Sequence, residues 1–327
     1  MMKTEELKLV QEWDKVFPQS EKVDHEKVTF VNRFGITLAA DLYKPKGTEG
    51  KLAALAVSGP FGAVKEQSSG LYAQTMAERG YLTVAFDPSF TGESGGFPRR
   101  VASPDINTDD FSAAVDYLSC RDDVDPERIG IIGICGWGGI AVNAAAADTR
   151  IKATLASTPY IMTEVATKGY FGMDDSAEKR MAARRVFSAQ RTEDYRTGTY
   201  LRGGGNPQQA PEDAPQFLKD YVDYYMRPRG FHERSGNSTD GWNLTSNISW
   251  ANTNLLQFAH EIESAVMVLH GEKAHSRYMG EMIFDKLTGD NKELVIVPGA
   301  SHCDLYDGGA DGVIPWDTIE EFFGKYV

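Results

Sequence analysis

Two kinds of hydrophobic pattern alternate along the chain. Short, nearly continuous apolar runs are typical of buried strands, whereas apolar residues three or four positions apart indicate helices. The runs that we interpret as buried strands are residues 52–57, 81–86, 128–134, 151–157, 264–269 and 294–297. The helical patterns cover residues 69–79, 109–120, 136–147 and 316–326. Repeated strand–helix units predict a mostly parallel, doubly wound α/β sheet.

The segment before these units has a different pattern. Residues 26–32 and 35–43 alternate between apolar and polar positions around a short turn, which predicts an N-terminal antiparallel hairpin. Residues 1–19 place Leu7, Val10 and Trp13 on one side of a helical projection. We therefore expect an amphipathic helix there, packed on the outside of the domain.

A long insertion interrupts the strand–helix units. Roughly a hundred residues separate the strands at 151–157 and 264–269, more than a connection needs. We expect a core of residues 1–160 and 260–327, and a lid of residues 161–259 over the C-terminal edge of the sheet. Helical patterns within the lid cover residues 177–190 and 212–225. Four lid aromatics could line a ligand pocket or form the lid's own core: Tyr224, Tyr225, Trp242 and Trp250.

Cys135 stands at the turn between the strand at 128–134 and the following helix. Gly133 and Gly136 flank it in the sequence GICGWGG, and such small neighbours permit a sharp, strained turn. This turn would project the sulfur above the sheet, beside the free amides of the helix N-terminus. We interpret Cys135 as a nucleophile rather than a buried structural thiol. Trp137 replaces the last small residue of the usual spacing and is a candidate for substrate contact or modulation.

A nucleophile of this kind needs a base, and His302 directly follows the last predicted strand in the loop PGASH. It would take the thiol proton or hold a thiolate–imidazolium pair. The acid that orients the base belongs after the preceding strand, where Glu272 is the nearest carboxylate, and Asp304 is the alternative. Because a thiol ionises more readily than a hydroxyl, Cys135 and His302 could also work as a dyad.

Acyl transfer also needs hydrogen-bond donors for the oxyanion of the tetrahedral intermediate. One expected donor is the amide of Gly136, directly after the nucleophile. The second comes from the loop after the first buried strand, where Pro60 has no amide hydrogen and Phe61 is therefore the candidate. Glu66, a few residues later, could modulate the protonation of the thiol.

Charge and cysteine content limit the partners. A formal net charge of −13 disfavours nucleic acid and anionic membranes, which bind clustered basic residues. The chain has neither an apolar leader nor a stretch of about 18 apolar residues, so we expect a cytoplasmic protein. Cys120, Cys135 and Cys303 form neither a disulfide framework nor a zinc motif. We expect no metal or cofactor, and a homo-oligomer remains compatible with the sequence.

The ordered motifs resemble one superfamily. The GPFG loop, the loop at 87–96, the GICGWGG turn and the PGASH loop look like those of the α/β hydrolases. A cysteine at the turn makes the chain most similar to the dienelactone-hydrolase-like branch. The resemblance implies an α/β-hydrolase fold with the N-terminal hairpin and a large helical lid insertion.

The same resemblance implies a function. A protein of this kind hydrolyses carboxylic esters, lactones or thioesters of a small-molecule acyl substrate through an acyl-cysteine, without a cofactor. Some similar proteins are acyl transferases, which is the alternative on the same fold. A third alternative is a non-catalytic thiol-sensing or binding protein, because Cys135 and Cys303 flank the same expected site and the usual acid is absent.

Overall fold

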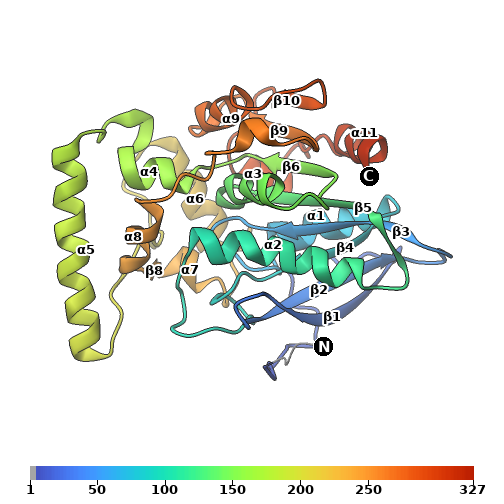
Figure 1. Cartoon of the computed structure of the whole chain (residues 1–327), viewed down its shortest axis with the longest axis horizontal. Coiled ribbons are helices and arrows are strands. Elements are labelled where there is room, and N and C mark those ends of the chain that lie inside the picture. Colours follow the sequence, from blue (N-terminus) through green and yellow to red (C-terminus); the bar gives the residue numbers. More distant parts are fainter. Residues whose placement is uncertain (1–4) are drawn as a thin grey trace.

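An eight-stranded sheet forms the centre of the protein (Figure 1), whose computed structural model describes residues 5–327. Its strands are β1 (Val23–Val31), β2 (Thr37–Pro45), β3 (Leu52–Ser58), β4 (Leu82–Phe86), β5 (Val124–Ile134), β6 (Ala153–Ser157), β9 (Ala265–Gly271) and β10 (Lys292–Val297). They are ordered β1-β2-β4-β3-β5-β6-β9-β10. Strand β2 pairs antiparallel with β1 and β4, and the other pairs are parallel. The predicted hairpin and mostly parallel sheet are confirmed.

Helices cover both faces of the sheet, which explains why its strands are continuous apolar runs. Leu55 and Val57 of β3 belong to the cluster that includes buried residues of α1 (Ser68–Glu78) and α11 (Trp316–Tyr326). Ala54 and Ala56 face the other way and cluster with α2 (Pro104–Ser119) and α3 (Gly136–Ala147). Two further helices, α9 (Arg277–Phe284) and α10 (Asp304–Asp307), follow β9 and β10.

Residues between β6 and β9 form a largely helical insert beyond one end of the sheet (Figure 1). Its elements are α4 (Met162–Lys168), η1 (Tyr170–Gly172), α5 (Ala177–Thr197), β7 (Arg202–Gly203), α6 (Gln216–Met226), α7 (Gly236–Thr239), β8 (Trp242–Asn243), η2 (Leu244–Ser246), α8 (Asn247–Trp250) and η3 (Ala259–Glu261). The amide of Ser238 donates to Gly62 O at 3.1 Å, which ties the insert to the loop after β3. In the described part of the chain, no helix combines the length and apolarity that crossing a membrane requires.

The predicted N-terminal helix is wrong over residues 5–19, and residues 1–4 lie outside the described part. Instead of bonding within a helix, the backbone of this segment bonds to other parts of the domain. The amide of Glu5 donates to Thr37 Oγ1 and that of Val10 to Glu93 Oε1, both at 2.6 Å. These tertiary contacts override the helical spacing of the apolar residues.

Candidate functional site

Cys135 adopts a backbone conformation that residues other than glycine rarely adopt. It lies between β5 and α3 with φ 58° and ψ −125°. Its amide donates to Ser157 O at 2.9 Å, and its carbonyl accepts from the amides of Gly138 and Tyr160, both at 2.8 Å. A strained residue held so firmly points to a functional role. The turn therefore has the geometry of a nucleophile elbow.

The two amides predicted for an oxyanion hole both lie at the Cys135 sulfur. As hydrogen-bond donors, those of Phe61 and Gly136 favour the anionic form of the thiol and lower its pKa. A Cβ on Gly136 would stand 2.6 Å from Phe61 Cβ, so the absence of a side chain lets the two segments approach. The Phe61 ring packs edge-on against Trp242 of the insert, with centroids 4.9 Å apart. This contact helps to fix the Phe61 backbone.

His302 reaches the same site from the loop after β10. Its Nε2 lies 3.0 Å from the hydroxyl of Tyr306 in α10. Tyr306 and Cys135 line the same pocket, and the Tyr306 hydroxyl, as a hydrogen-bond donor, lowers the pKa of the Cys135 thiol. Tyr306 thus links the two predicted catalytic side chains.

The partners of His302 Nδ1 are hydroxyl groups and not the predicted carboxylates. Ser276 Oγ lies 2.6 Å from Nδ1 and Thr158 Oγ1 lies 3.0 Å from it. Thr158 itself has φ 41°, an unusual value for a β-branched residue at the end of a strand. The strain at Thr158 accompanies its placement against the histidine ring.

The two predicted acids lie elsewhere. Glu272 is exposed, and its Oε2 accepts from the amide of Gly299 at 2.8 Å. Asp304 accepts from the amide of Ser301 at 2.8 Å and pairs with Arg229 at 3.4 Å. Both carboxylates stabilise local loop structure. The groups that orient His302 are therefore the hydroxyls of Ser276 and Thr158.

We expect Ser276→Ala to lower kcat/KM about fivefold, since a hydrogen bond is worth about 1 kcal/mol and Thr158 still contacts the ring. Glu272→Gln removes the carboxylate charge at the predicted acid and should change kcat/KM less than about twofold. Steady-state kinetics with an activated acyl substrate compares the variants. A larger loss in Glu272→Gln than in Ser276→Ala would restore the carboxylate as the orienting group.

Burial favours the neutral forms of both the Cys135 thiol and the His302 imidazole. Desolvation raises the pKa of the Cys135 thiol, and the hydrogen bonds that Tyr306, Phe61 and Gly136 give to the thiolate form offset only part of this. Desolvation, followed by repulsion from His275 and His270, lowers the pKa of His302 well below its ordinary value. A resting pair of thiol and neutral imidazole follows, and not the thiolate–imidazolium pair that was the other prediction.

A pocket of about 270 Å³ opens over Cys135. It is lined largely by aromatic residues of the insert and core: Phe61, Tyr170, Phe217, Tyr221, Tyr225 and Trp242. No charged side chain lines it among the described residues. Of the four insert aromatics considered from the sequence, Tyr225 and Trp242 line this pocket, whereas Tyr224 and Trp250 are buried outside it.

Trp137 is not at the pocket, contrary to the prediction. It is 2% exposed and packs edge-on against Phe86 and Phe111 in the core, with centroids 5.7 and 5.4 Å away. A Cβ on Gly59 would lie 2.7 Å from Trp137 Cβ, so the preceding loop needs glycine to pass this ring. The large residue at the elbow is accommodated in the core and does not line the pocket over Cys135.

Glu66 also lies away from the thiol, within a buried ion-pair cluster. Its Oε1 lies 2.7 Å from Lys65 Nζ, 3.0 Å from Lys27 Nζ and 2.9 Å from Arg234. Burial alone would raise the pKa of Glu66, but these cations hold it well below its ordinary value. Glu66 therefore joins the first strands, the loop after β3 and the insert instead of modulating Cys135.

We expect Glu66→Ala to lower the free energy of unfolding at pH 7 by about 3 kcal/mol, because it leaves buried cations without a partner. The exposed Glu49→Ala is the matched control and should change it by less than about 0.5 kcal/mol. Since the folded-state pKa of Glu66 is depressed, its contribution is complete above its unfolded pKa of about 4.3 and is lost as pH falls through the folded value. Urea unfolding measures both effects, and equal stability of the two variants would contradict this role.

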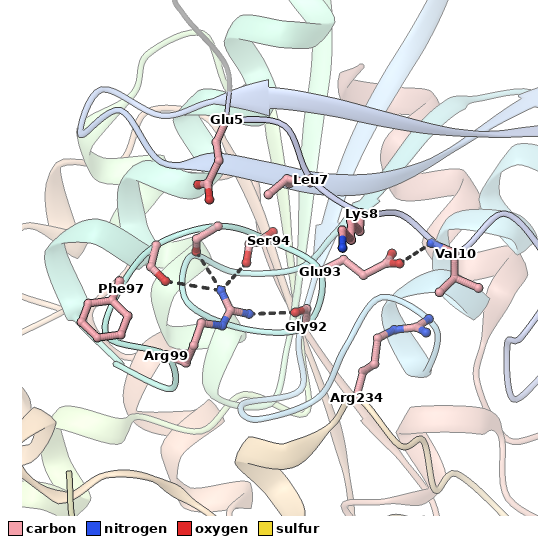
Figure 2. A pocket seen from close by; sticks show the side chains of 12 residues that line it. Glu5, Leu7, Lys8, Val10, Gly92, Glu93, Ser94, Phe97, Arg99 and Arg234 are labelled. Carbon is pink, nitrogen blue, oxygen red and sulfur yellow. Dashed lines mark hydrogen bonds between the residues drawn. The ribbon is translucent and has the colours of Figure 1, made fainter. Parts of the chain in front are cut away.

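A second hollow, of about 570 Å³, lies elsewhere (Figure 2). The N-terminal segment and the loop after β4 line it, together with Arg234 of the insert. Arg99 donates to Gly92 O at 2.7 Å and to other carbonyls of the same loop, so its guanidinium is engaged in holding the loop. No cysteine or histidine lines this hollow, and the pocket at Cys135 is therefore the candidate active site.

Sequence reasoning missed three residues of the site: Tyr306, Ser276 and Thr158. Tyr306 lies four residues after His302, a spacing that one helical turn converts into proximity. Ser276 lies in the loop where an acid was expected. Thr158 follows β6, at the same sheet edge as Cys135, but only its backbone strain distinguishes it from other threonines.

Comparison with known proteins gives the family. Residues 35–304 match the family described as X-Pro dipeptidyl-peptidase (S15 family). An uncharacterised protein of Pseudomonas aeruginosa, PA2218, is 54% identical over 98% of this chain and 86% of its own length. Its crystal structure superposes with a TM-score of 0.94, over 99% of this chain and 100% of that one. The uncharacterised protein YcjY of Escherichia coli is 33% identical over 91% of this chain and 98% of its own length.

More distant similarities support the fold and name related activities. The α/β hydrolase GrgF of Penicillium is 20% identical, with a TM-score of 0.73 over 93% of this chain and 99% of that one. Together with the sheet order, this confirms the predicted α/β-hydrolase fold. The acyltransferase drtE of Aspergillus calidoustus is 30% identical, but over only 57% of this chain and 58% of its own.

Proposed function

The chain belongs to the X-Pro dipeptidyl-peptidase (S15) family of hydrolases, and we propose that it cleaves carboxylic esters, lactones or thioesters through an acyl-cysteine. In this proposal Cys135 is the nucleophile, as in the dienelactone-hydrolase-like branch that the sequence resembles. The observation that supports it most is the positive φ of Cys135 together with two backbone amides at its sulfur. A structural thiol requires neither the strained turn nor the amides.

The proposed reaction begins with transfer of the Cys135 proton to His302. The thiolate attacks the acyl carbon, and the amides of Phe61 and Gly136 stabilise the resulting oxyanion. Collapse of the tetrahedral intermediate breaks the bond to the leaving alcohol or thiol, which takes the proton from His302. Water then attacks the acyl-cysteine with His302 as general base, which releases the acid and restores the thiol.

The pocket favours an uncharged acyl group with an aromatic or similarly flat shape. Its lining is aromatic and carries no charged side chain among the described residues. A dipeptidyl-peptidase must recognise the charged amino terminus of its substrate, and a buried ammonium group requires an anionic partner. The family resemblance therefore does not extend in this proposal to cleavage of X-Pro peptides.

A panel of activated substrates tests the proposal. We expect turnover of aromatic and short aliphatic acyl thioesters and nitrophenyl esters, with a product burst that equals the enzyme concentration. X-Pro nitroanilides should not be cleaved at a comparable rate. Faster cleavage of the X-Pro compounds than of every ester and thioester would overturn the proposed substrate class.

Acyl transfer to another nucleophile is the second candidate. The similarity to the acyltransferase drtE supports it, as does the aromatic lining around Cys135, a residue that is 6% exposed. Turnover in the presence of added alcohols and amines distinguishes the two reactions. A hydrolase yields the free acid at every acceptor concentration, whereas a transferase yields mainly the new ester or amide.

A further inference from the structure

The Tyr306 hydroxyl links the two reacting side chains. It is 3.0 Å from His302 Nε2, and Tyr306 lines the pocket over Cys135 together with Tyr225. As a hydrogen-bond donor it also lowers the pKa of the Cys135 thiol. Tyr306 is fully buried, and its ring packs against Tyr224 with centroids 4.9 Å apart. Among the hydrogen bonds of residues 5–327, those of the His302 ring go to Ser276, Thr158 and Tyr306.

One of the two neutral tautomers of His302 satisfies every hydrogen bond of this network. A neutral imidazole has one donor and one acceptor nitrogen. If Nδ1–H donates to the hydroxyls of Ser276 and Thr158, Nε2 is the acceptor and Tyr306 donates to it. The tyrosine oxygen then has two remaining lone-pair positions, which the thiol of Cys135 and the hydroxyl of Tyr225 can fill as donors. All three partners of Tyr306 are accounted for in this arrangement.

We propose that Tyr306 is a catalytic residue that carries the proton between Cys135 and His302. In the forward direction the S–H bond of Cys135 breaks and a new O–H bond forms on Tyr306, while the original O–H bond breaks and an N–H bond forms at Nε2. The products are a thiolate, a neutral tyrosine and an imidazolium. No other reactant is required, and the reverse transfer returns the proton. The inference deepens the proposed acyl-cysteine mechanism and rests on it.

The two transfers should occur in one step. Burial, followed by repulsion from a Cys135 thiolate and from Tyr225, raises the pKa of Tyr306 well above its ordinary value, so a free phenolate would be costly. A concerted transfer avoids both a phenolate and a doubly protonated oxygen. After the transfer, the new Tyr306 hydroxyl hydrogen can point at the thiolate and stabilise it.

Alkylation of Cys135 tests the proposal without any acyl substrate. The full chain is treated with iodoacetamide at pH 7, and peptide mass spectrometry measures the rate at Cys135. Because alkylation follows thiolate formation, we expect Tyr306→Phe to slow it at least about tenfold. Tyr224→Phe is the matched control, since Tyr224 packs against Tyr306 and its hydroxyl is not among the groups bonded to Cys135 or His302. It should stay within about twofold of the wild type.

An unchanged or faster alkylation rate in folded Tyr306→Phe would overturn the relay. Circular dichroism in the near ultraviolet establishes whether the variant is folded. A second measurement needs no variant: the rate of the acyl burst in mixtures of light and heavy water. Two protons in flight give a curved dependence on the deuterium fraction, whereas a linear dependence contradicts the relay.

The outcomes separate the relay from the proposed function. If no ester or thioester acylates the wild-type protein, but Tyr306→Phe still slows the alkylation of Cys135, the proton relay is supported and the proposed hydrolase activity is refuted. Normal acylation by Tyr306→Phe would refute the relay and leave the acyl-cysteine mechanism in place.

Discussion

Replacing Cys135 by alanine should abolish the product burst and lower kcat/KM for an activated ester or thioester by about 10³-fold or more. The variant keeps the backbone amides of Phe61 and Gly136 but has no atom that can form the covalent intermediate. Losses of this size are typical when a nucleophile is removed and only binding and the oxyanion donors remain. Burst kinetics and steady-state rates measure the effect.

Cys120→Ala is the matched control, because Cys120 is exposed and follows α2, away from the pocket. We expect its kcat/KM within about twofold of the wild type. A folded Cys135→Ala protein with wild-type turnover would remove Cys135 from the mechanism.

The thiol-sensing alternative would pair Cys135 with Cys303. Because Cys303 is fully buried, oxidation of this pair would require the core beside α10 to open.

His302→Gln should lower kcat/KM by about 10²- to 10⁴-fold, the usual contribution of a general base. Glutamine preserves much of the shape and hydrogen-bonding capacity but cannot accept the proton. The pH profile provides a second test. Because burial, with repulsion from His275 and His270, lowers the pKa of His302, the base stays neutral through the range near pH 6.5 where an ordinary histidine titrates.

The wild-type kcat/KM should therefore stay level around pH 6.5 and fall only at lower pH, where protonation removes the base. In His302→Gln this acid limb should disappear, and the remaining rate should rise with pH as the thiol ionises unaided. A wild-type profile that loses half its rate near pH 6.5, or a variant that retains the acid limb, would contradict His302 as the base.

Local patterns were sufficient to predict the framework that positions Cys135. Continuous apolar runs identified β3, β4, β6, β9 and residues 129–134 of β5, because a sheet covered on both faces buries almost every side chain along these stretches. Gly133 and Gly136 identified the elbow, since a Cβ at either position would meet atoms at 2.1 and 2.6 Å. The apolar runs follow from the period of a single element, and Gly133 makes room for Trp137, four residues further along the chain.

The errors arose where distant segments decide the structure. The helical spacing of Leu7, Val10 and Trp13 did not reveal that the neighbouring backbone bonds to β2 and to the loop after β4. The same holds for Glu66, whose cationic partners come from β1, from its own loop and from the insert. Their separation in sequence gives no periodic signal.

The orientation of His302 illustrates the limit most clearly. The search for a carboxylate led to Glu272, whereas two hydroxyls from different strand ends hold the ring. No sequence pattern distinguishes a serine or threonine whose hydroxyl contacts a histidine from one whose hydroxyl faces solvent. Tyr306 was overlooked for a related reason, since its role depends on the one-turn helix α10.

Rapid-quench mass spectrometry during the first turnover tests the central claim most directly. The enzyme is mixed with an aromatic acyl thioester, quenched in acid within the burst and digested. We expect the acyl mass on the peptide that contains Cys135, at a stoichiometry equal to the burst. Turnover without that adduct, or an acyl group on a different residue at the same stoichiometry, would contradict it.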